Sequence, residues 1–378
     1  MGELVKIGDI DHRMPATTDD GVPYLMTGDF CGVNELNFDG VKHVSREDYD
    51  ILSRKIKPEL GDILFARYAS VGAVRYVDFT RDFLISYSCA IIKKGEKIDS
   101  KFLYHFLSSD IAQKQIQLEI NTGSQANIGI DSMKNNIFVF MPSKAEQIKI
   151  SKYLSDMDTL ITLHQRKYEK LITVKKSMLE KMFPRDGSNN PEIRFIGFTD
   201  PWEQRKFSDF AQRESTIWTS SSEYPSVEYE DVVAEEGRLN KDVRRKDTQK
   251  TGIAFDGSQV LYGKLRPYLH NWLNPDFVGV AVGDWWVLRP VEVNKNFLYR
   301  LIQTQQFDDV ANQSSGSKMP RADWNLVSNT EFNVPSSLDD QKQIAKTFDN
   351  LDNLITLHQR KLEKLKNIKQ SLLQNMFV

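Results

Sequence analysis

An internal repeat constrains the fold of this chain more than any other feature. The eight letters LITLHQRK stand at 160–167 and again at 354–361. The likeness extends over PSKAEQIKISKYLSDMDTLITLHQRKYEKLITVKKSMLEKMF, which begins at 142, and PSSLDDQKQIAKTFDNLDNLITLHQRKLEKLKNIKQSLLQNMF, which begins at 335. Upstream of each copy, weaker similarities keep the same order: VKIGDI with RKFSDF, KFLYHFL with NFLYRLI, and NTGS with QSSGS. This self-similarity indicates a tandem duplication in which a variable half precedes a conserved segment, twice.

Both conserved segments are predicted to be long helices that form a coiled coil. Their apolar residues recur at alternating steps of three and four, which predicts a seam against one helical partner. No Pro or Gly interrupts 144–183 or 336–378, and Pro142 and Pro335 stand just before each start. We expect the two copies to pack on each other as an antiparallel pair about a pseudo-two-fold axis. The predicted seam consists of Leu154, Met157, Ile161, His164, Tyr168 and Leu171 in the first copy and Phe348, Leu351, Ile355, His358, Leu362 and Leu365 in the second.

The polar exceptions in the seam coincide between the two copies, His164 with His358 and Lys175 with Lys369. His164 is the midpoint of 145–183 and His358 is the midpoint of 339–377, and only midpoints meet their own copies in an antiparallel pair. We therefore predict that the two imidazoles approach each other and fix the register of the helices. A metal site is the alternative, but the six histidines show no ligand spacing. The other interpretation is that the two segments are core helices of an ordinary α/β protein. It explains neither the length of the helices nor their duplication.

The predicted fold class is α+β, with two mixed α/β domains separated by the two long helices. Residues 61–79 and 89–95 are predicted to be strands with turns between them, and 100–117 and 296–313 have helical spacing. The predicted boundaries are 1–143 for the first variable domain, 144–183 for the first helix, 184–199 for a linker, 200–335 for the second variable domain and 336–378 for the second helix. The linker is assigned because it is rich in Pro, Gly and Asn.

Composition and motifs give no sign of a catalytic centre. The formal net charge is −2, so any basic surface has to be local. Two cysteines, Cys31 and Cys89, cannot build a disulfide framework or a zinc site, which favours a reducing compartment. Neither G-x-x-x-x-G-K-[ST] nor G-x-G-x-x-G occurs, and NPDF at 274–277 departs from the Asn-Pro-Pro-aromatic methyltransferase motif at Asp276. Because no run of 18 apolar residues occurs either, we expect a non-enzymatic cytoplasmic protein without metal, cofactor or membrane span.

Two variable halves that alternate with two nearly identical helices resemble the specificity subunit of type I restriction-modification systems. The resemblance rests on 142–183 and its second copy, on GDILFARYASVG at 61–72 and on PEIRFIGFTDPWEQ at 191–204, and it covers essentially the whole chain. It implies two target recognition domains, each reading one half of a bipartite, asymmetric site in double-stranded DNA. It also implies that the helices set the spacing and dock two methyltransferase subunits, which nuclease-translocase subunits join. S-adenosylmethionine, ATP and Mg²⁺ would then belong to the partners.

Candidate DNA contacts follow from chemistry, because Lys, Arg and small polar groups on loops bind phosphates, while Arg, Lys, Asn and Gln read base edges. In the first half the candidates are Arg67, Tyr68, Ser70, Arg75, Ser124, Gln125 and Asn127. In the second half they are Arg244, Arg245, Lys246, Lys264, Arg266, Tyr268, Asn271, Ser317, Lys318 and Arg321. All six tryptophans lie in the second variable half and both cysteines in the first, so the helices repeat while the two halves differ.

Two other functions remain open. A coiled-coil scaffold that only joins proteins would bind DNA without regard to sequence or not at all, and the near-zero net charge mildly favours it. A self-sufficient modification enzyme would transfer methyl groups unaided, which the missing motifs argue against.

Overall fold

The computed structural model describes residues 1–123, 125–185, 188–246, 249–313 and 319–377. Its contacts divide the chain into two compact units. Unit 1 consists of Met1–Tyr168 and Leu357–Val378, and unit 2 of Glu169–Thr356. Each unit therefore contains one variable half together with a segment of both long helices.

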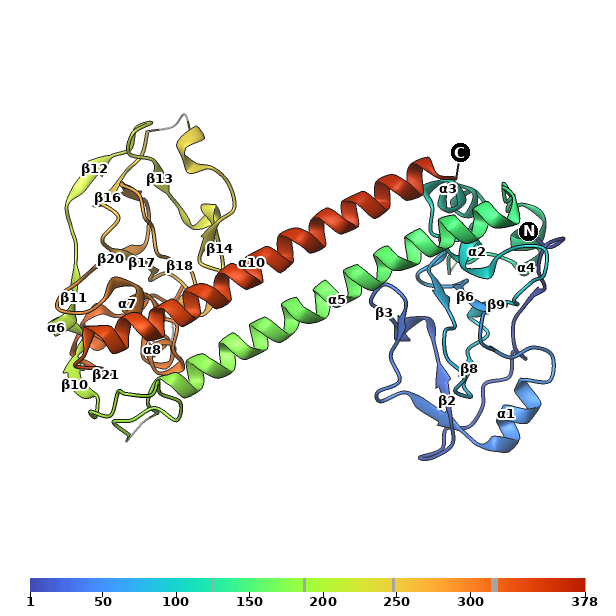
Figure 1. Ribbon diagram of the computed structural model, residues 1–378, viewed down its shortest axis with the longest axis horizontal. Helices are drawn as coiled ribbons and strands as arrows, with labels where there is room; N and C mark the ends of the chain where they lie inside the picture. The colour runs from blue at the N-terminus through green and yellow to red at the C-terminus, as the bar shows by residue number, and fades with distance from the viewer. Residues whose placement is uncertain (124, 186–187, 247–248, 314–318, 378) are drawn as a thin grey trace. The chain divides into compact units, whose positions relative to one another are not determined.

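The two predicted long helices are α5 (Lys144–Met182) and α10 (Leu338–Asn375). Ser143 and Ser337 precede them, and each hydroxyl accepts a hydrogen bond from the backbone N–H three residues later. This cap satisfies a donor that the first turn of a helix leaves free. Within each unit the segments of α5 and α10 run antiparallel (Figure 1), which confirms the predicted antiparallel coiled coil.

The residues predicted for the seam are buried or partly buried. In unit 1, Leu154, Met157 and Ile161 are buried, with 0%, 5% and 2% of their surface exposed. In unit 2, Phe348 of α10 is fully buried, and Met178 and Leu351 pack against the same apolar core. Every residue named for the seam is described by the structure, and none is exposed.

Unit 1 contains small sheets, and the helices α2–α4 pack against the sheet formed by β1, β9, β6 and β7. Its sheets have the strand orders β1-β9-β6-β7 and β5-β2-β8, beside the hairpin β3-β4. The strands are β1 (Ile7–Gly8), β2 (Val22–Leu25), β3 (Phe30–Cys31), β4 (Glu35–Leu36), β5 (Lys42–Val44), β6 (Ile63–Ala66), β7 (Val74–Tyr76), β8 (Leu84–Ile85) and β9 (Cys89–Ile92). The helices are η1 (Thr27–Asp29), α1 (Arg46–Leu52), α2 (Ser100–Leu107), α3 (Asp110–Leu118) and α4 (Ile130–Asn135).

Unit 2 repeats this plan with additions. Its sheets have the orders β11-β20-β17-β18 and β12-β16-β19-β13, beside the pairs β14-β15 and β10-β21. The strands are β10 (Glu203–Lys206), β11 (Ala211–Arg213), β12 (Ile217–Thr219), β13 (Ser226–Val227), β14 (Val232–Val233), β15 (Arg238–Leu239), β16 (Thr251–Phe255), β17 (Val260–Gly263), β18 (Trp272–Leu273), β19 (Gly279–Ala281), β20 (Trp285–Pro290) and β21 (Glu331–Val334). The helices are α6 (Phe207–Phe210), η2 (Tyr229–Asp231), η3 (Val243–Arg245), η4 (Pro267–Leu269), α7 (Lys295–Leu301), α8 (Gln305–Ala311) and α9 (Trp324–Asn329).

Each of the helical stretches predicted from spacing, 100–117 and 296–313, consists of two helices. In unit 1 the break falls at Ser109, whose hydroxyl accepts a hydrogen bond from the N–H of Ala112 at 3.3 Å and so starts α3. In unit 2, Thr304 caps α8 in the same way. A capping hydroxyl satisfies the first free N–H groups of a new helix and allows the chain to turn before it. The apolar spacing alone did not indicate this break.

A phenylalanine anchors the end of one long helix in each unit. In unit 1, Phe377 follows the end of α10 and packs on Phe102 of α2, with ring centroids 5.4 Å apart. In unit 2, Phe183 follows α5 and packs on Phe297 of α7 at 5.5 Å and on Trp202 at 5.8 Å. Each unit thus buries the end of a helix that begins in the other unit.

Cys31 and Cys89 are free thiols, and burial raises the pKa of Cys89 to about 12. In the described parts of the chain, no helix has the length and apolarity needed to cross a bilayer.

Candidate nucleic-acid interface

The structure brings the two groups of first-half candidates together in unit 1. Residues 67–73 form the loop between β6 and β7, and this loop lies beside the segment 125–128. Tyr68 forms an isolated antiparallel bridge with Asn127. The N–H of Ile128 donates a hydrogen bond to the carbonyl of Arg67 at 3.1 Å. The loop and the segment therefore act as one surface element.

Unit 2 repeats this arrangement in the loop 264–271, which follows β17. Leu265 forms an isolated antiparallel bridge with Arg321. The N–H of Arg266 donates to the carbonyl of Pro320 at 2.7 Å. The candidates on the loop and the described candidate Arg321 are therefore neighbours here as well. Ser124, Ser317 and Lys318 lie outside the described residues.

Both loops hold a non-glycine residue in the left-handed backbone region at the same position. Ala69, with φ 58°, directly follows the bridged Tyr68, and Arg266, with φ 50°, directly follows the bridged Leu265. For a residue with a Cβ this conformation costs roughly 1–2 kcal/mol. Such strain persists only where the surroundings enforce it, and it is concentrated at functional sites. The repeated backbone therefore marks the two loops as the candidate site.

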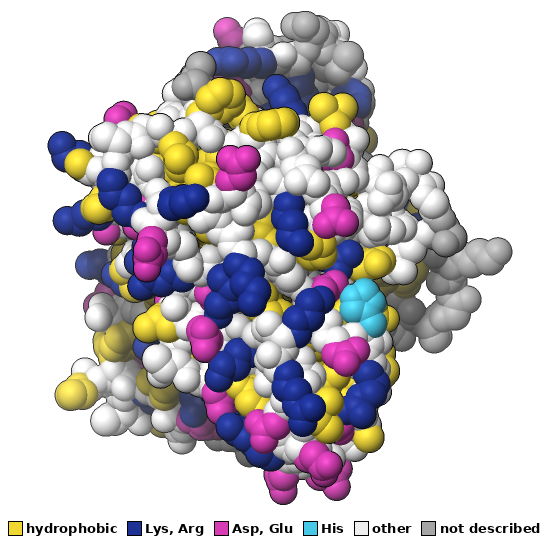
Figure 2. Space-filling model, turned by 90° about the vertical axis from the view of Figure 1, so that its right-hand side faces the viewer, with side chains coloured by type: hydrophobic (Ala, Val, Ile, Leu, Met, Phe, Trp, Pro, Cys, Tyr) yellow, Lys and Arg dark blue, Asp and Glu magenta, His cyan; other side chains and the backbone are white. Residues whose placement is uncertain are grey.

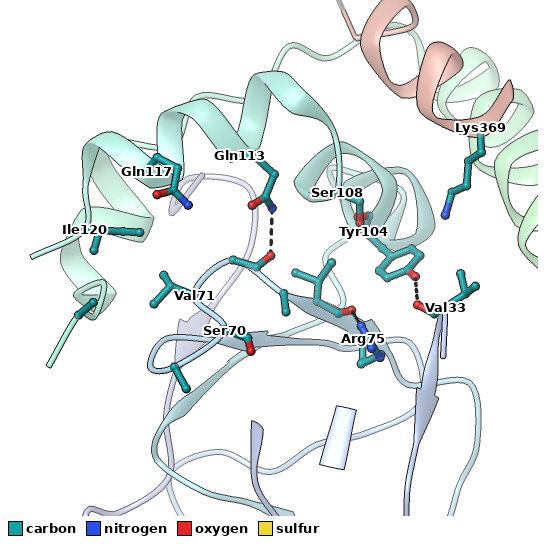
Figure 3. A pocket seen from close by; sticks show the side chains of 15 residues that line it. Val33, Ser70, Val71, Arg75, Tyr104, Ser108, Gln113, Gln117, Ile120 and Lys369 are labelled. Atoms are coloured by element: carbon teal, nitrogen blue, oxygen red, sulfur yellow. Dashed lines mark hydrogen bonds between the residues drawn. The ribbon is translucent and has the colours of Figure 1, made fainter. Parts of the chain in front are cut away.

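A groove of about 630 Å³ opens beside the loop of unit 1. Ser70 lines it from the loop, while Gln113 and Gln117 line it from α3 (Figure 3). Nε2 of Gln113 donates to the carbonyl of Gly72 at 3.0 Å, which ties α3 to the loop. Lys369 of α10 completes the lining on another side. Hydroxyl and amide groups of this kind can bind phosphates and base edges, whereas the ammonium group of Lys369 is paired with Asp158.

Arg67 is buried in the domain and is not open to a ligand. It is 6% exposed, its Nη1 lies 2.5 Å from Oδ2 of Asp9, and its Nε donates to the carbonyl of Ile128 at 3.0 Å. Burial acts to raise the pKa of Asp9, but the hydrogen bond of His12 and the charges of Arg67 and Lys55 outweigh burial and lower it. The placement of Arg67 does not favour the predicted DNA contact, because its guanidinium holds the strand end and the loop together.

Arg75 also serves the domain itself. Its Nε donates to the carbonyl of Glu35 at 3.1 Å and its Nη2 to that of Gly32 at 3.3 Å, and its guanidinium lies over the ring of Phe30. Burial lowers the pKa of Arg75. These bonds hold the β3-β4 hairpin. Although Arg75 lines the groove, its placement therefore does not favour a DNA contact. Among the first-half candidates, Ser70 and Gln125 are exposed, and Tyr68, Arg75 and Asn127 are partly exposed.

Two second-half candidates are likewise committed to the fold. Asn271 is 7% exposed. The ammonium group of Lys246 lies 2.8 Å from Glu228 and pairs with the buried Asp231. The placement of Asn271 and Lys246 does not favour the predicted DNA contacts. Arg244 and Arg245 are exposed on η3.

The cations at the unit 2 loop differ in their partners. Nζ of Lys264 lies 3.5 Å from Asp284, and Nη2 of Arg321 lies 3.1 Å from the same carboxylate. The hydrogen bond from Arg321 and the charge of Lys264 lower the pKa of Asp284. Arg266 is exposed and has no ion-pair partner among the residues that the structure describes. Tyr268, two residues further on, is 52% exposed.

The predicted contact of the two seam histidines is confirmed. Nδ1 of His164 lies 2.8 Å from Nδ1 of His358, and the ring centroids are 5.0 Å apart. Burial, together with the charges of Lys361 and Lys167, lowers the pKa of both rings. Across the described ranges, no group of three or more His, Cys, Asp or Glu side chains could hold a metal ion.

The two seam lysines pair with aspartates of the opposite helix. Lys175 lies 2.7 Å from Asp352 in unit 2, and Lys369 pairs with Asp158 in unit 1. These four residues occupy corresponding positions of the two copies. The two lysines occupy the same seam position in both copies, which the sequence showed, but their aspartate partners were not predicted.

The two variable domains contact the long helices beside these ion pairs, and they do so with different side chains. In unit 2, Arg300 of α7 donates to Asp352 and to Asp349, both at 2.6 Å. In unit 1, Nε2 of His105 of α2 lies 3.0 Å from the hydroxyl of Ser155. Burial lowers the pKa of His105 to about 3, so its ring is neutral. A cation thus faces two carboxylates in one unit, and a neutral ring faces a hydroxyl in the other.

Corresponding leucines on the long helices are exposed rather than buried. Leu160 and Leu163 of α5 are 45% and 49% exposed, and Leu354 and Leu357 of α10 are 43% and 45% exposed. Exposed apolar side chains on a helix that is already paired indicate a surface for a further partner.

On the face shown in Figure 2, Lys and Arg side chains are interspersed with Asp and Glu. This face carries no continuous field of one sign, in keeping with the net charge of −2. The charges on this face therefore do not by themselves identify a binding site.

The fold and the paired loops define a duplicated protein in which two related α/β domains carry the same loop frame on an antiparallel pair of helices. The family model described as type I restriction modification DNA specificity domain matches residues 2–173 and 199–367, so the chain belongs to this family. A relative from Methanocaldococcus jannaschii, the type I restriction enzyme MjaVIII specificity subunit, is 23% identical over 402 residues, which cover 98% of this chain and 91% of the relative.

Two solved structures show the same fold. The S subunit of a type I restriction-modification system from M. genitalium matches with a TM-score of 0.67 at 18% identity, over 100% of this chain and 94% of that one. A chain solved for the structural basis of complex assembly and conformational transition of the type I R-M system matches with a TM-score of 0.50 at 13% identity, over 98% of this chain and 95% of that one.

Proposed function

We propose that this chain is the sequence-specific DNA-recognition subunit of a type I restriction-modification complex and has no catalytic activity of its own. Each variable domain would read one half of a bipartite, asymmetric site in double-stranded DNA. The coiled coil would set the spacing of the half-sites and dock methyltransferase subunits. The observation that carries this proposal is the loop that both units build with one backbone and different side chains.

The shared backbone supports a common way of presenting side chains to DNA. In both units the left-handed residue follows the bridged one, so the next side chains leave the domain from equivalent positions. In unit 1 the three positions after the bridged residue carry Ala69, Ser70 and Val71, and in unit 2 they carry Arg266, Pro267 and Tyr268. Different side chains on one frame suit two half-sites of different sequence, because base edges are read by the hydrogen-bonding groups that side chains offer.

The partners follow from the family and from the long helices. The exposed leucines of α5 and α10 suit the docking of two methyltransferase subunits at corresponding positions of the repeat. Nuclease-translocase subunits would join this core. S-adenosylmethionine, ATP and Mg²⁺ would bind to those partners, because this chain lacks the phosphate-binding motifs. Since the DNA bound would be that of the cell, we place the protein in the cytoplasm.

A coiled-coil scaffold without sequence-specific DNA binding is the second candidate. The exposed leucines and the mixed charges of the face in Figure 2 favour it. It does not account for the strain at Ala69 and Arg266, which a scaffold has no reason to maintain in both units.

Methylation mapping tests the proposal. Genomic adenine methylation is compared between cells that contain this chain with its methyltransferase partner and cells in which the chain is deleted. A bipartite motif should depend on the chain, and exchange of one variable half should change one side of the motif only. If methylation is the same with and without the chain, the scaffold function is the better account.

A further inference from the structure

We propose that Arg266 reads a guanine in the half-site bound by unit 2, through the N7 and O6 acceptors that guanine presents in the major groove. This inference rests on the proposed function and names one base and one side chain within it. Arginine that donates two hydrogen bonds to guanine is the commonest specific contact between proteins and DNA bases.

The backbone of Arg266 is held on both sides. Its N–H donates to the carbonyl of Pro320 at 2.7 Å, and its carbonyl accepts from the N–H of Leu269 at 2.8 Å. Pro267, the next residue, begins the short helix η4 and fixes its own φ angle. A side chain on such a rigid turn leaves the domain in a defined direction, which a specific base contact needs.

The side chain of Arg266 does nothing for the fold. It is exposed, and no described residue forms a hydrogen bond or ion pair with its guanidinium, whereas Lys264 and Arg321 beside it are both held by Asp284. Its left-handed backbone would suit glycine better than arginine. Arginine is thus the more strained choice at this position, and a role outside the folded domain accounts for it.

Unit 1 has the same backbone without the side chain. Ala69 occupies the equivalent position with φ 58° but presents only a methyl group. A guanine contact from this position is therefore expected in one half-site and not in the other. This difference supplies a matched control, because the same substitution relieves the same strain in both units.

The test compares Arg266→Gly, Arg266→Lys and Ala69→Gly by methylation mapping with the methyltransferase partner. For Arg266→Gly we expect discrimination at one G·C pair of one half-site to fall about tenfold to a hundredfold, while the other half-site is unchanged. Arg266→Lys should not restore this discrimination, because an ammonium group cannot match two acceptors as the planar guanidinium does. Ala69→Gly should leave the whole motif as it is.

Folding is measured separately through tryptophan fluorescence. All six tryptophans belong to unit 2, so this signal follows the unit that contains Arg266. Arg266→Gly should unfold at the same urea concentration as the parent chain or a higher one, because glycine relieves the left-handed strain. A lower midpoint would overturn the argument that arginine is a strained choice here.

The outcomes separate the two proposals. If the parent chain directs no bipartite motif, the proposed function fails. If the parent chain directs such a motif and Arg266→Gly changes neither the motif nor the rate of methylation, only the guanine contact fails. A uniform loss at all sites that Arg266→Lys restores would make the contact a phosphate contact, and lost discrimination at an A·T pair would exclude guanine; each result overturns the inference.

Discussion

The Nδ1 atoms of His164 and His358 lie 2.8 Å apart, so the N–H of one ring donates a hydrogen bond that the nitrogen of the other ring accepts. Two imidazolium rings could not keep this contact, because both would offer N–H groups and positive charge. His164 and His358 belong to unit 1, as does the buried His105. Acid should therefore act on this unit first.

We predict that unit 1 becomes less stable as the pH falls from 7.5 to 5. Burial lowers the pKa of all three histidines, that of His105 to about 3. Between about pH 6.5 and the lower folded pKa the unfolded chain binds more protons, so stability is lost by about 1.4 kcal/mol per pH unit for a fully shifted ring. Urea unfolding followed by far-UV circular dichroism measures this. His105→Gln should flatten the dependence, and an unchanged slope would contradict the assignment.

Unit 2 should respond to acid in the opposite sense at His270. The hydrogen bond with Asp308 raises the pKa of His270, so its contribution is present below the unfolded value and is lost as the pH rises through the folded value. Tryptophan fluorescence reports on unit 2 alone. The unfolding midpoint by fluorescence should fall less between pH 7.5 and 6 than the midpoint by circular dichroism. His270→Asn should remove the part of this difference between the two midpoints that is due to the imidazole ring of His270.

The two seam lysines should differ in importance although they correspond in the repeat. Lys369→Met leaves Asp158 buried without a cation, at a cost of roughly 3 kcal/mol to unit 1. Lys175→Met leaves Asp352 with Arg300, so the cost to unit 2 should be about 1 kcal/mol or less. Urea unfolding of both variants checks this. Equal losses would show that Arg300 does not replace the lysine.

The exposed leucines should matter for assembly and not for folding. Changing Leu160, Leu163, Leu354 and Leu357 to Gln should alter stability by less than about 0.5 kcal/mol per site. Binding of the methyltransferase subunit should weaken by tenfold or more, as measured by analytical ultracentrifugation. Ile196→Gln, at a fully exposed position of the linker, is the control. Unaltered assembly in the quadruple variant would place the docking surface elsewhere.

Arg67 and Ser70 should separate stability from recognition in unit 1. Arg67→Met leaves the buried carboxylate of Asp9 with weaker partners and should destabilise unit 1 by about 2 kcal/mol. Ser70→Ala, at an exposed loop position, should leave the unfolding midpoint unchanged and weaken methylation at one half-site. Circular dichroism and methylation mapping give the two readouts. A stable Arg67→Met variant with an altered motif would restore Arg67 as a DNA contact.

The coiled coil could be predicted because its sequence pattern is local and occurs in both copies of the repeat. The seam spacing, the uninterrupted helices and the midpoint histidines all depend on residues within one segment, and the structure places His164 against His358 accordingly. The sequence placed candidates on both loops of each half, but only the structure shows that the bridges Tyr68–Asn127 and Leu265–Arg321 join these loops.

The roles of individual cations could not be predicted, because their partners are distant in the sequence. Asp9 pairs with Arg67 across 58 positions, and Asp308 contacts His270 across 38. Residue type and position in a loop do not distinguish a cationic side chain that binds DNA from one that pairs with an acidic side chain of its own domain. Only the three-dimensional arrangement shows that Arg67 is enclosed and that Arg266 is open.

The unequal charges around His105 and Arg300 bear on what would follow if two such chains exchanged their variable halves. Ser155 and Asp158 precede the identical segment 160–167, and Asp349 and Asp352 precede its copy at 354–361. A genetic crossover within the identical segment would transfer each variable half together with the helix residues that match it. The lysines beyond the segment are the same in both copies, so they serve either half. Recombination at the repeat can therefore produce new pairs of halves without leaving a buried charge unmatched.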